Sequence, residues 1–333
     1  MKIAVTKEAL LEGLQRIQNV VSTRPTLPVL TNVLLEADES GVQLTTTDLE
    51  VGIRCRIEAR VEKPGATTLP ARKLVSIIRE LPSSEITIDV DSKNIASIRC
   101  GSSFFKIYGL PREEFPAFPV FTEPKSLTLK QSELKDGLRK TSYAISNDEA
   151  RYVLNGILFS LQENKLTLVA TDGRRLALFE TELEFPKSHE RDFILPTKAV
   201  TELQRLLNDD SVIVISTSNN LVSFELNGCQ LVSKIVEGSY PNYRQVIPGE
   251  ATERVTLERE ALYNCVRRVA LLSNDKTSSL RLSLSKNNLD IEFFQKFCNN
   301  ITYFIHFLPH KIFFVIFDNC FDLFIKDTIR FPT

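Results

Sequence analysis

The sequence lacks the short motifs that mark most enzyme classes. It contains no P-loop, no Gly-x-Ser-x-Gly and no His-Glu-x-x-His. P-loop nucleotide hydrolysis, serine-nucleophile chemistry and zinc proteolysis therefore have no signature in the chain. We predict a protein with no catalytic residues, no metal and no cofactor.

Cysteine spacing excludes further classes of protein. None of the six cysteines forms a Cys-x-x-Cys pair, which argues against a zinc cage or a disulfide framework, and most are interpreted as buried thiols. They are Cys55, Cys100, Cys229, Cys265, Cys298 and Cys320. The first residues, MKIAVTKEALLEGL, contain no apolar segment with a small-residue cleavage site. No secretory signal is expected, and the predicted compartment is the cytoplasm.

Length and composition indicate a globular protein of more than one domain. A chain of 333 residues is too long for one ordinary core and suits two or three domains of roughly 100 to 150 residues. Hydrophobic residues at 43% and charged residues at 25% are typical of packed proteins. The net charge is only −1, so a nucleic-acid role requires basic residues gathered on one surface and offset elsewhere.

The chain repeats itself. Residues 127–178 align with residues 3–53 through a whole supersecondary unit. Leu10 pairs with Leu134, Asp48 with Asp172, Pro70 with Pro196 and Pro116 with Pro241, at offsets of 124, 124, 126 and 125 residues. A steady offset indicates duplicated domains. A third copy opens at residues 255–292, where Leu262 follows Leu134 by 128 residues.

Each copy has the pattern of an α+β domain. In the first helix, Ala9, Leu10, Leu14, Ile17 and Val21 recur at helical spacing. Residues 85–90, 211–216 and 221–226 alternate or are β-branched, which predicts strands. A second helix follows a Leu-Pro pair in each of the first two copies, at a position where proline is tolerated. We expect antiparallel sheet with helices on one face.

The charge distribution fits a protein whose helices face nucleic acid. The expected helices are 7–21, 72–80, 131–143, 197–207 and 259–270, with net charges of 0, +2, +1, +1 and +2. They total +6, so the rest of the chain totals −7. Basic helices that contact only phosphates give salt-sensitive affinity without sequence information. For any single helical Lys or Arg, a solvated surface position is the simpler interpretation.

Two aspartates offer an alternative enzyme hypothesis. Asp48 and Asp172 could hold metal ions for phosphoryl transfer. That chemistry needs several acids converging on ions roughly 4 Å apart. The two residues occupy equivalent places in separate repeats, so we expect them to lie apart. An interaction scaffold that does not bind DNA is a second alternative.

Seven segments together resemble one family. They are residues 22–30 (STRPTLPVL), 47–53 (TDLEVGI), 69–74 (LPARKL), 150–159 (ARYVLNGILF), 169–178 (VATDGRRLAL), 195–203 (LPTKAVTEL) and 238–248 (GSYPNYRQVIP). In order and spacing they resemble the bacterial sliding clamp, the beta subunit of DNA polymerase III, over residues 1 to about 292. The resemblance implies clamp domains at 1–120, 126–249 and 253–292, and a head-to-tail homodimeric ring with helices lining the hole. The family clamp has no catalytic role and tethers the polymerase to double-stranded DNA.

The resemblance also implies a cleft for short linear peptides from partners such as the polymerase III alpha subunit, the clamp loader and repair factors. The matching positions are Leu154, Thr171, Gly173, Arg174, Arg175, Leu176, Pro241 and Val246. An apolar cleft with a few polar positions suits such peptides. Asp172 and Gly173 could instead form a simple turn, because Asp-Gly is a hairpin signal. Leu154 and Leu176 could be ordinary core residues.

DNA contacts and ring closure map to further positions. The loops implied for DNA carry Arg24, Arg151 and Tyr152, and an arginine in a Pro-flanked loop suits a phosphate. Weaker candidates, from helix charge alone, are Arg72, Lys73, Lys198, Arg267 and Arg268. The resemblance places Phe105, Leu271 and Leu272 at the dimer interface, where apolar side chains would meet. Burial in the core is the competing interpretation of these three.

The segment 293–333 departs from the pattern. Phe supplies 11 of its 41 residues, against 10 of the preceding 292, which favours a foreign or frameshifted segment. Charged and proline residues interrupt it, so no uncharged run reaches the 18 or so residues of a membrane span. His306 and His310 are spaced for a metal pair, but Pro309 opposes a helix there. The alternative hypothesis is therefore a truncated or frameshifted variant whose weakened third domain cannot close a ring.

Overall fold

The computed structural model describes two compact units. Residues 1–21, 27–121, 125–208, 211–247, 256–272, 280–285 and 288–293 are described with their side chains, and 253–254, 302–303, 314–317, 320–325 and 330–331 by their backbone. One unit comprises Met1–Ala170 with Leu178–Tyr240, and the other Thr171–Ala177 with Pro241–Thr333. Arg24 lies outside the described residues.

The described residues of the first repeat form two α-helices and nine strands. Its elements are β1 (Lys2–Thr6), α1 (Lys7–Ile17), β2 (Asn32–Asp38), β3 (Gly41–Thr47), β4 (Val51–Ile57), β5 (Arg60–Lys63), β6 (Gly65–Pro70), α2 (Ala71–Glu80), β7 (Glu85–Val90), β8 (Ile95–Cys100) and β9 (Ser103–Tyr108). The Thr6 hydroxyl accepts a hydrogen bond from the N–H of Ala9 and caps α1. Leu10, Leu14 and Ile17 are buried along that helix, as their spacing predicts.

The second repeat follows the same order. Its elements are β10 (Lys125–Lys130), α3 (Gln131–Thr141), β11 (Gly156–Gln162), β12 (Lys165–Thr171), β13 (Leu176–Glu182), β14 (Arg191–Pro196), α4 (Thr197–Leu206), β15 (Val212–Thr217), β16 (Leu221–Leu226) and β17 (Cys229–Lys234). Helix α1 ends four residues and α3 two residues before the predicted boundary, because a short 3-10 turn follows each of them, at Gln18–Val20 and Ser142–Ala144. The two repeats therefore share their element order, except that β5 of the first has no counterpart among the described strands of the second.

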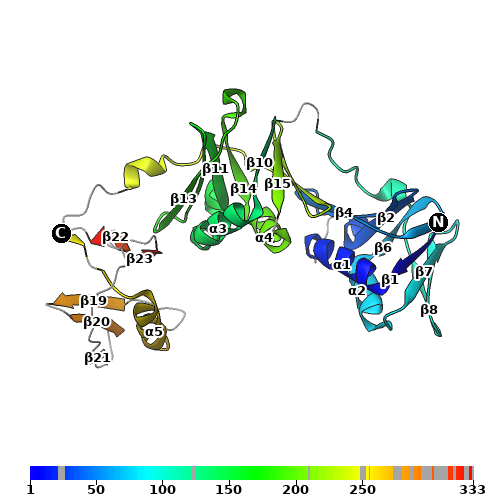
Figure 1. Cartoon of the computed structure of the whole chain (residues 1–333), viewed down its shortest axis with the longest axis horizontal. Coiled ribbons are helices and arrows are strands. Elements are labelled where there is room, and N and C mark those ends of the chain that lie inside the picture. Colours follow the sequence, from blue (N-terminus) through cyan, green and yellow to red (C-terminus); the bar gives the residue numbers. More distant parts are fainter. Residues whose placement is uncertain are drawn as a thin grey trace. The chain divides into compact units, whose positions relative to one another are not determined.

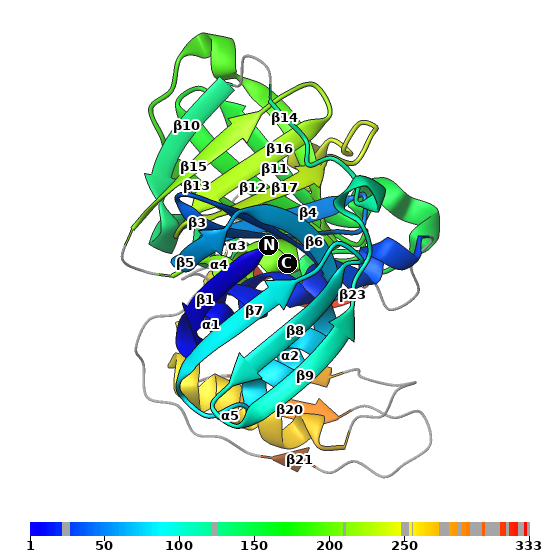
Figure 2. The same cartoon turned by 90° about the vertical axis from the view of Figure 1, so that its right-hand side faces the viewer.

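Within the first unit the strands form three antiparallel sheets (Figures 1 and 2). The orders are β5-β1-β7-β8-β9, β13-β12-β11-β14, and β10-β15-β16-β17-β4-β3-β2-β6. The eight-stranded sheet is continuous across both repeats because β17 of the second pairs with β4 of the first. This β4–β17 junction, with the side chains that cross it, is called the seam below.

Helices cover one side of these sheets in each repeat, and a glycine allows the close approach. A Cβ at Gly13 of α1 would lie 2.6 Å from Ile57 Cγ2, and one at Gly137 of α3 would lie 2.7 Å from Phe179 Cδ1. The two glycines are 124 residues apart and occupy the same place in the duplicated unit. The fully buried Phe159 stacks on Phe193 at 5.0 Å between ring centroids and anchors the core of the second repeat.

The second unit contains α5 (Arg259–Ala270), the predicted helix of the third copy. Its strands are β18 (Glu253–Arg254), β19 (Leu280–Ser285), β20 (Asn288–Phe293), β21 (Thr302–Tyr303), β22 (Phe314–Phe317), β23 (Cys320–Ile325) and β24 (Arg330–Phe331). Leu262, Cys265 and Val269 of α5 form a core with Leu289 and Ile291 of β20. His306 and His310 lie outside the described residues.

No helix in the described part of the chain has the length and apolar character needed to cross a membrane.

Candidate functional site

The predicted cleft residues 171–176 form one tight turn between β12 and β13. The hydroxyl of Thr171 donates to the Arg175 carbonyl at 2.6 Å and accepts from the N–H of Gly173 at 3.1 Å. One carboxylate oxygen of Asp172 accepts from the N–H groups of Arg174 and Arg175 at 2.9 and 3.0 Å. Gly173 has φ +83°, which a glycine adopts without steric cost. The turn interpretation of Asp172 and Gly173 is therefore confirmed.

The first repeat has the same turn. Asp48 accepts from the N–H groups of Glu50 and Val51 at 2.9 and 2.7 Å, and Thr47 accepts from Leu49 at 3.1 Å. Leu49 occupies the place of Gly173 and also has a positive φ, +78°. Both carboxylates are thus engaged in backbone turns. Across the described residues, no group of three His, Cys, Asp or Glu side chains is placed to hold a metal ion.

The turn changes the acidity of Asp172. Partial burial raises the pKa of this carboxyl, but the N–H groups of Arg174 and Arg175 and the Arg175 guanidinium, 3.2 Å from Oδ2, outweigh that effect. The pKa of Asp172 is consequently held below its ordinary value. The ionised form stabilises the turn, because a carboxylate accepts hydrogen bonds from these three donors more strongly than a protonated carboxyl would.

Asp172→Asn is expected to lower stability at pH 7 by about 1 kcal/mol, since the amide keeps one acceptor but loses the charge. A depressed carboxyl pKa stabilises the fold above the unfolded value, near 4, and this contribution is lost as the pH falls further. The difference in unfolding midpoint between wild type and Asp172→Asn should therefore shrink as the pH is lowered from 7 to 3. Asp172→Ala, which removes the acceptor at every pH, is the control. A difference of constant size would contradict this account.

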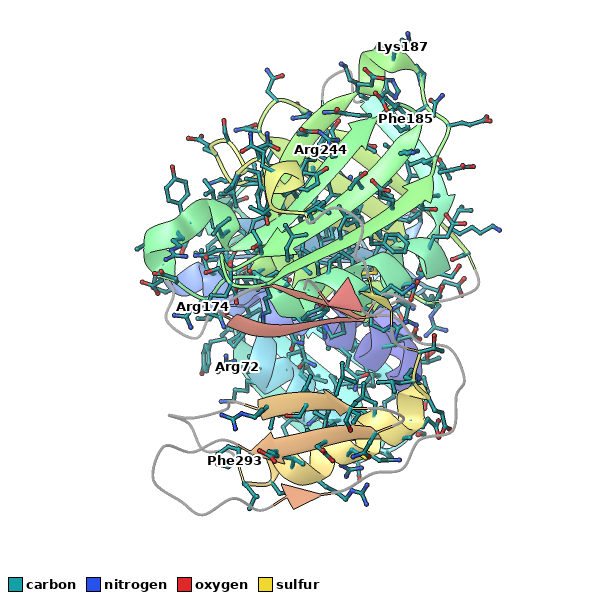
Figure 3. The ribbon with its side chains drawn as sticks, turned by 90° about the vertical axis from the view of Figure 1, so that its left-hand side faces the viewer. Arg72, Arg174, Phe185, Lys187, Arg244 and Phe293 are labelled. Carbon is teal, nitrogen blue, oxygen red and sulfur yellow. A yellow bond between two sulfur atoms is a disulfide. The ribbon has the colours of Figure 1, made fainter. Side chains whose placement is uncertain are left out.

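The other predicted cleft positions differ in exposure. Leu154 and Leu176 are 6% and 7% exposed, so each is largely a core residue. Arg174, labelled in Figure 3, is exposed, as are Pro241 and Val246, and the side chain of Val246 is 55% exposed. Thr171–Ala177 and the segment from Pro241 onward belong to one unit, whereas Leu154 belongs to the other.

The basic candidates for DNA contact also differ in their surroundings. Arg151 lies beside Asp148, with 3.4 Å between Nε and Oδ2, in a short helical segment, Glu149–Leu154, where Tyr152 is 59% exposed. Arg72 and Lys73 are exposed on the first turn of α2, and Arg267 and Arg268 on the last turn of α5. The exposed position of Arg72 is visible in Figure 3.

Lys198 has a structural partner that the sequence did not reveal. Its ammonium group pairs with Asp48 of the other repeat and donates to the Val20 carbonyl at 3.1 Å. It therefore helps to close the seam, and its charge is partly compensated. Arg205, on the same helix, donates to the carbonyls of Gln15 and Arg16 at 2.9 Å each. These contacts place α4 against the end of α1.

Strand β9 is an edge with exposed aromatic side chains. Among the described strands it pairs with β8 alone, and Phe104, Phe105 and Tyr108 are 46%, 39% and 74% exposed. The guanidinium of Arg99 lies 4.6 Å from the Phe104 ring centre. In the second unit, Leu271 and Leu272 follow α5 and are 82% and 40% exposed. All three predicted interface residues are thus at the surface of the described chain.

Protein-family models match this duplicated architecture along the chain. They describe the DNA polymerase III beta subunit: its N-terminal domain matches residues 1–119, its central domain 128–242 and its C-terminal domain 244–297. This chain belongs to the beta sliding clamp family. The match to the C-terminal clamp domain continues past Glu292, where the resemblance read from the sequence stops.

Curated clamps are similar over most of their length. The beta sliding clamp of Chlamydia muridarum is 34% identical over 291 residues, covering 87% of this chain and 80% of that protein. The beta sliding clamp of Pseudomonas putida is 38% identical over 298 residues, covering 88% and 80%. A truncated-variant interpretation is not favoured by matches of this extent.

Solved clamp structures share the fold. A DNA polymerase III beta sliding clamp from Bartonella birtlesii, crystallised with griselimycin, superposes with a TM-score of 0.87 at 34% identity, covering 94% of this chain and 86% of that one. The sliding clamp of Bacillus subtilis gives 0.87 at 25% identity, with the same coverage. The predicted α+β clamp fold is confirmed.

Proposed function

We propose that this protein is a non-catalytic processivity factor that closes into a head-to-tail homodimeric ring around duplex DNA. The observation that carries the proposal is that two equivalent edge strands differ in whether they are paired. Strand β17 of the second repeat is paired with β4, whereas β9, its equivalent in the first repeat, has a free edge in the described chain. A repeated module that joins its neighbour through this edge leaves one edge at β9 to be filled by a second copy.

The chemistry of β9 supports such a contact. Three aromatic side chains on a short strand are partly exposed, and aromatic residues are enriched at protein interfaces. Leu271 and Leu272, after α5, are the apolar residues proposed to meet Phe105 of a second copy. A heterologous contact of this kind closes into a ring only when the rotation between copies is right, and we propose that two copies of this chain meet that condition.

The helices provide the proposed DNA-facing surface. The five helical segments considered above carry a net charge of +6 in a chain of net charge −1. The contacts of Lys198 and Arg205 bring helices of neighbouring repeats to the same side of the seam. Phosphate contacts by basic side chains give affinity that is independent of sequence and falls with salt. Such contacts permit sliding, with Arg24, Arg151 and Tyr152 as the proposed loop contributors.

The exposed turn at Arg174 and the segment at Val246 are proposed to receive peptides from the polymerase III alpha subunit and the clamp loader. A cytoplasmic location is part of the same proposal. Solved relatives are described with griselimycin bound, which supports a ligand-binding groove in the family. An exposed valine and a polar turn within one unit suit an amphipathic peptide with apolar anchors.

Topological linkage provides the direct test. The protein, loaded by a bacterial clamp loader onto nicked circular plasmid, is expected to remain with the DNA through gel filtration at about 0.5 M salt, where phosphate contacts alone are lost. Cutting the plasmid once with a restriction enzyme should release it. A protein that leaves circular and linear DNA equally at that salt would overturn the proposal.

A further inference from the structure

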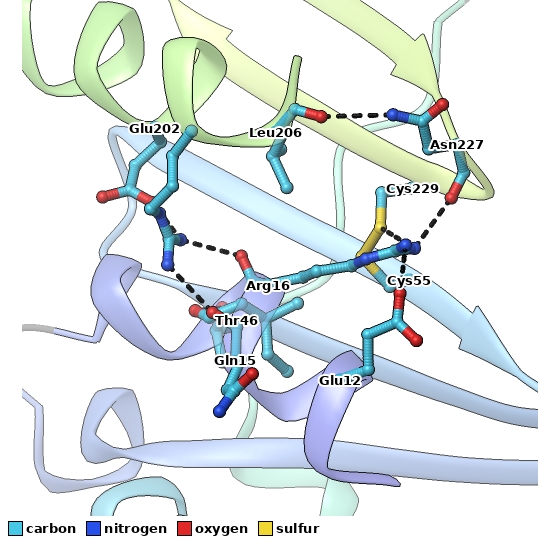
Figure 4. The surroundings of a disulfide bond; sticks show 11 residues. Glu12, Gln15, Arg16, Thr46, Cys55, Glu202, Leu206, Asn227 and Cys229 are labelled. Atoms are coloured by element: carbon cyan, nitrogen blue, oxygen red, sulfur yellow. Dashed lines mark hydrogen bonds and ion pairs between the residues drawn. A yellow bond between two sulfur atoms is a disulfide. The ribbon is translucent and has the colours of Figure 1, made fainter. Parts of the chain in front are cut away.

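Two cysteines face each other across the seam. Cys55 of β4 and Cys229 of β17 are register partners in the antiparallel pair, their Cα atoms are 4.1 Å apart, and a disulfide joins them (Figure 4). Facing residues in neighbouring antiparallel strands bring their Cβ atoms within reach of one another. The ladder therefore places these two thiols together, although 174 residues separate them in the sequence. Cys55 and Cys229 are buried, as predicted for most of the cysteines, but the spacing in the sequence did not predict that these two would be joined.

The surroundings of the two sulfur atoms differ. Cys55 is 1% exposed, whereas Cys229 is 5% exposed and directly follows a two-residue turn, Asn227 and Gly228, with φ values of +50° and +71°. A Cβ added at Gly228 would have no atom within 4 Å, so the turn opens to solvent. Cys229 is thus the member of the pair that lies nearer to the surface.

A positive charge stands beside Cys229. Nη1 of Arg16 lies 3.8 Å from its sulfur and is held in place by the Asn227 carbonyl at 2.9 Å. Glu12 pairs with the same guanidinium at 2.6 Å. A neighbouring guanidinium favours the thiolate, which is the form that attacks a disulfide. The two free cysteines whose side chains are described, Cys100 and Cys265, are buried, and neither is paired with a second cysteine.

We propose that Cys55 and Cys229 form a reversible thiol–disulfide site that locks the seam between the two repeats in response to a low-molecular-weight disulfide such as oxidised glutathione. The Cys229 thiolate attacks one glutathione sulfur and expels one glutathione thiolate. The Cys55 thiolate then attacks the Cys229 sulfur and expels the second. Two protein thiols are oxidised, one glutathione disulfide is reduced to two thiols, and the two protein protons pass to the released thiolates.

The link has a physical consequence for the seam. In the reduced protein, β4 and β17 are joined by backbone hydrogen bonds and by side chains such as Lys198 and Arg205. The disulfide closes a long loop between residues that are far apart in sequence, and this restricts the conformations of the unfolded chain. The unfolding midpoint of the linked form is expected to exceed that of the reduced form by on the order of 10 °C.

The test begins with full-length protein equilibrated in oxidised glutathione or in dithiothreitol, alkylated and digested for mass spectrometry. A peptide pair joined through Cys55 and Cys229 is expected in the first sample and should be absent from the second. The proposal is wrong if, in the sample treated with oxidised glutathione, each cysteine carries its own glutathione group. It is also wrong if both are alkylated there and were therefore free thiols.

Matched variants separate the lock from a general effect of reduction. Wild type and Cys100→Ser, which alters a buried thiol of the same unit, should both lose about 10 °C in unfolding midpoint on reduction. Cys55→Ser and Cys229→Ser should unfold at the same temperature in both conditions. A redox-dependent midpoint in Cys229→Ser would overturn the assignment.

The role of Arg16 is tested by rate. In the reduced protein, Arg16→Gln is expected to slow glutathionylation of Cys229 several-fold in a Cys55→Ser background, while Arg16→Lys retains most of the rate. Equal rates in all three proteins would remove Arg16 from the site.

Discussion

Phe105→Asp is expected to convert the protein from a dimer to a monomer at micromolar concentration. In the proposed ring, Phe105 of one copy packs against the apolar end of α5 in the next. An aspartate there would lose the aromatic contact area and would place an unpaired charge in a desolvated contact. Together these costs are about 3 kcal/mol or more, so the dissociation constant should rise by at least about 100-fold.

Analytical ultracentrifugation across a concentration series measures this change directly. Val120→Asp is the control, because Val120 is 84% exposed but lies outside β9. It should leave the dimer intact. Circular dichroism should give the same spectrum for both variants, since Phe105 is 39% exposed on an edge strand and contributes little to the core. A stable dimer in Phe105→Asp would place the subunit contact elsewhere.

Local patterns in the sequence predicted the helices and the duplication well. The start of α5 at Arg259 and the strands β7 and β16 fall on the predicted residues. They could be predicted because apolar spacing and β-branched runs are local signals that depend on only a few neighbouring residues. The helix ends were harder, because whether the last turn is α-helical or 3-10 depends on what the following residues pack against.

Contacts between the repeats could not be predicted in this way. The register of β17 against β4 is set by two folded modules meeting, so neither the facing cysteines nor the Lys198–Asp48 pair has a local signature. From helix charge alone, Lys198 was a weak candidate for a phosphate contact, with a solvated surface position as the simpler interpretation, and the structure gives it a carboxylate partner. The turn at Asp172, by contrast, was predictable because Asp-Gly fixes its own backbone hydrogen bonds.

Arg205→Met should be the most destabilising single change at the surface of the seam. The Arg205 guanidinium contacts two carbonyl groups in the last turn of α1 and pairs with Glu202, whose side chain is only 7% exposed. Methionine fills similar volume but leaves a buried carboxylate and the helix carbonyls without a donor. Because Arg205 itself is 33% exposed, solvent compensates in part, and we expect a loss of about 2 to 3 kcal/mol.

This loss corresponds to a fall of roughly 5–10 °C in the unfolding midpoint, which calorimetry would detect. Lys234→Met is the control, because the Lys234–Glu50 pair also crosses the seam but is exposed on both sides. It should change stability little. If Arg205→Met were as mild as Lys234→Met, the buried carboxylate would not depend on the guanidinium.

The duplication supplies a second, sharper comparison. Arg79 lies 126 residues before Arg205, at the same position of α2 that Arg205 holds in α4, and it is exposed. If the ring repeats the seam between copies, Arg79 contacts the end of α5 in a second chain. Arg79→Met should therefore leave the unfolding midpoint of the monomer unchanged and raise the dimer dissociation constant about tenfold. The same substitution would then weaken the fold at one seam and the assembly at the other, because equivalent contacts join modules within a chain and between chains.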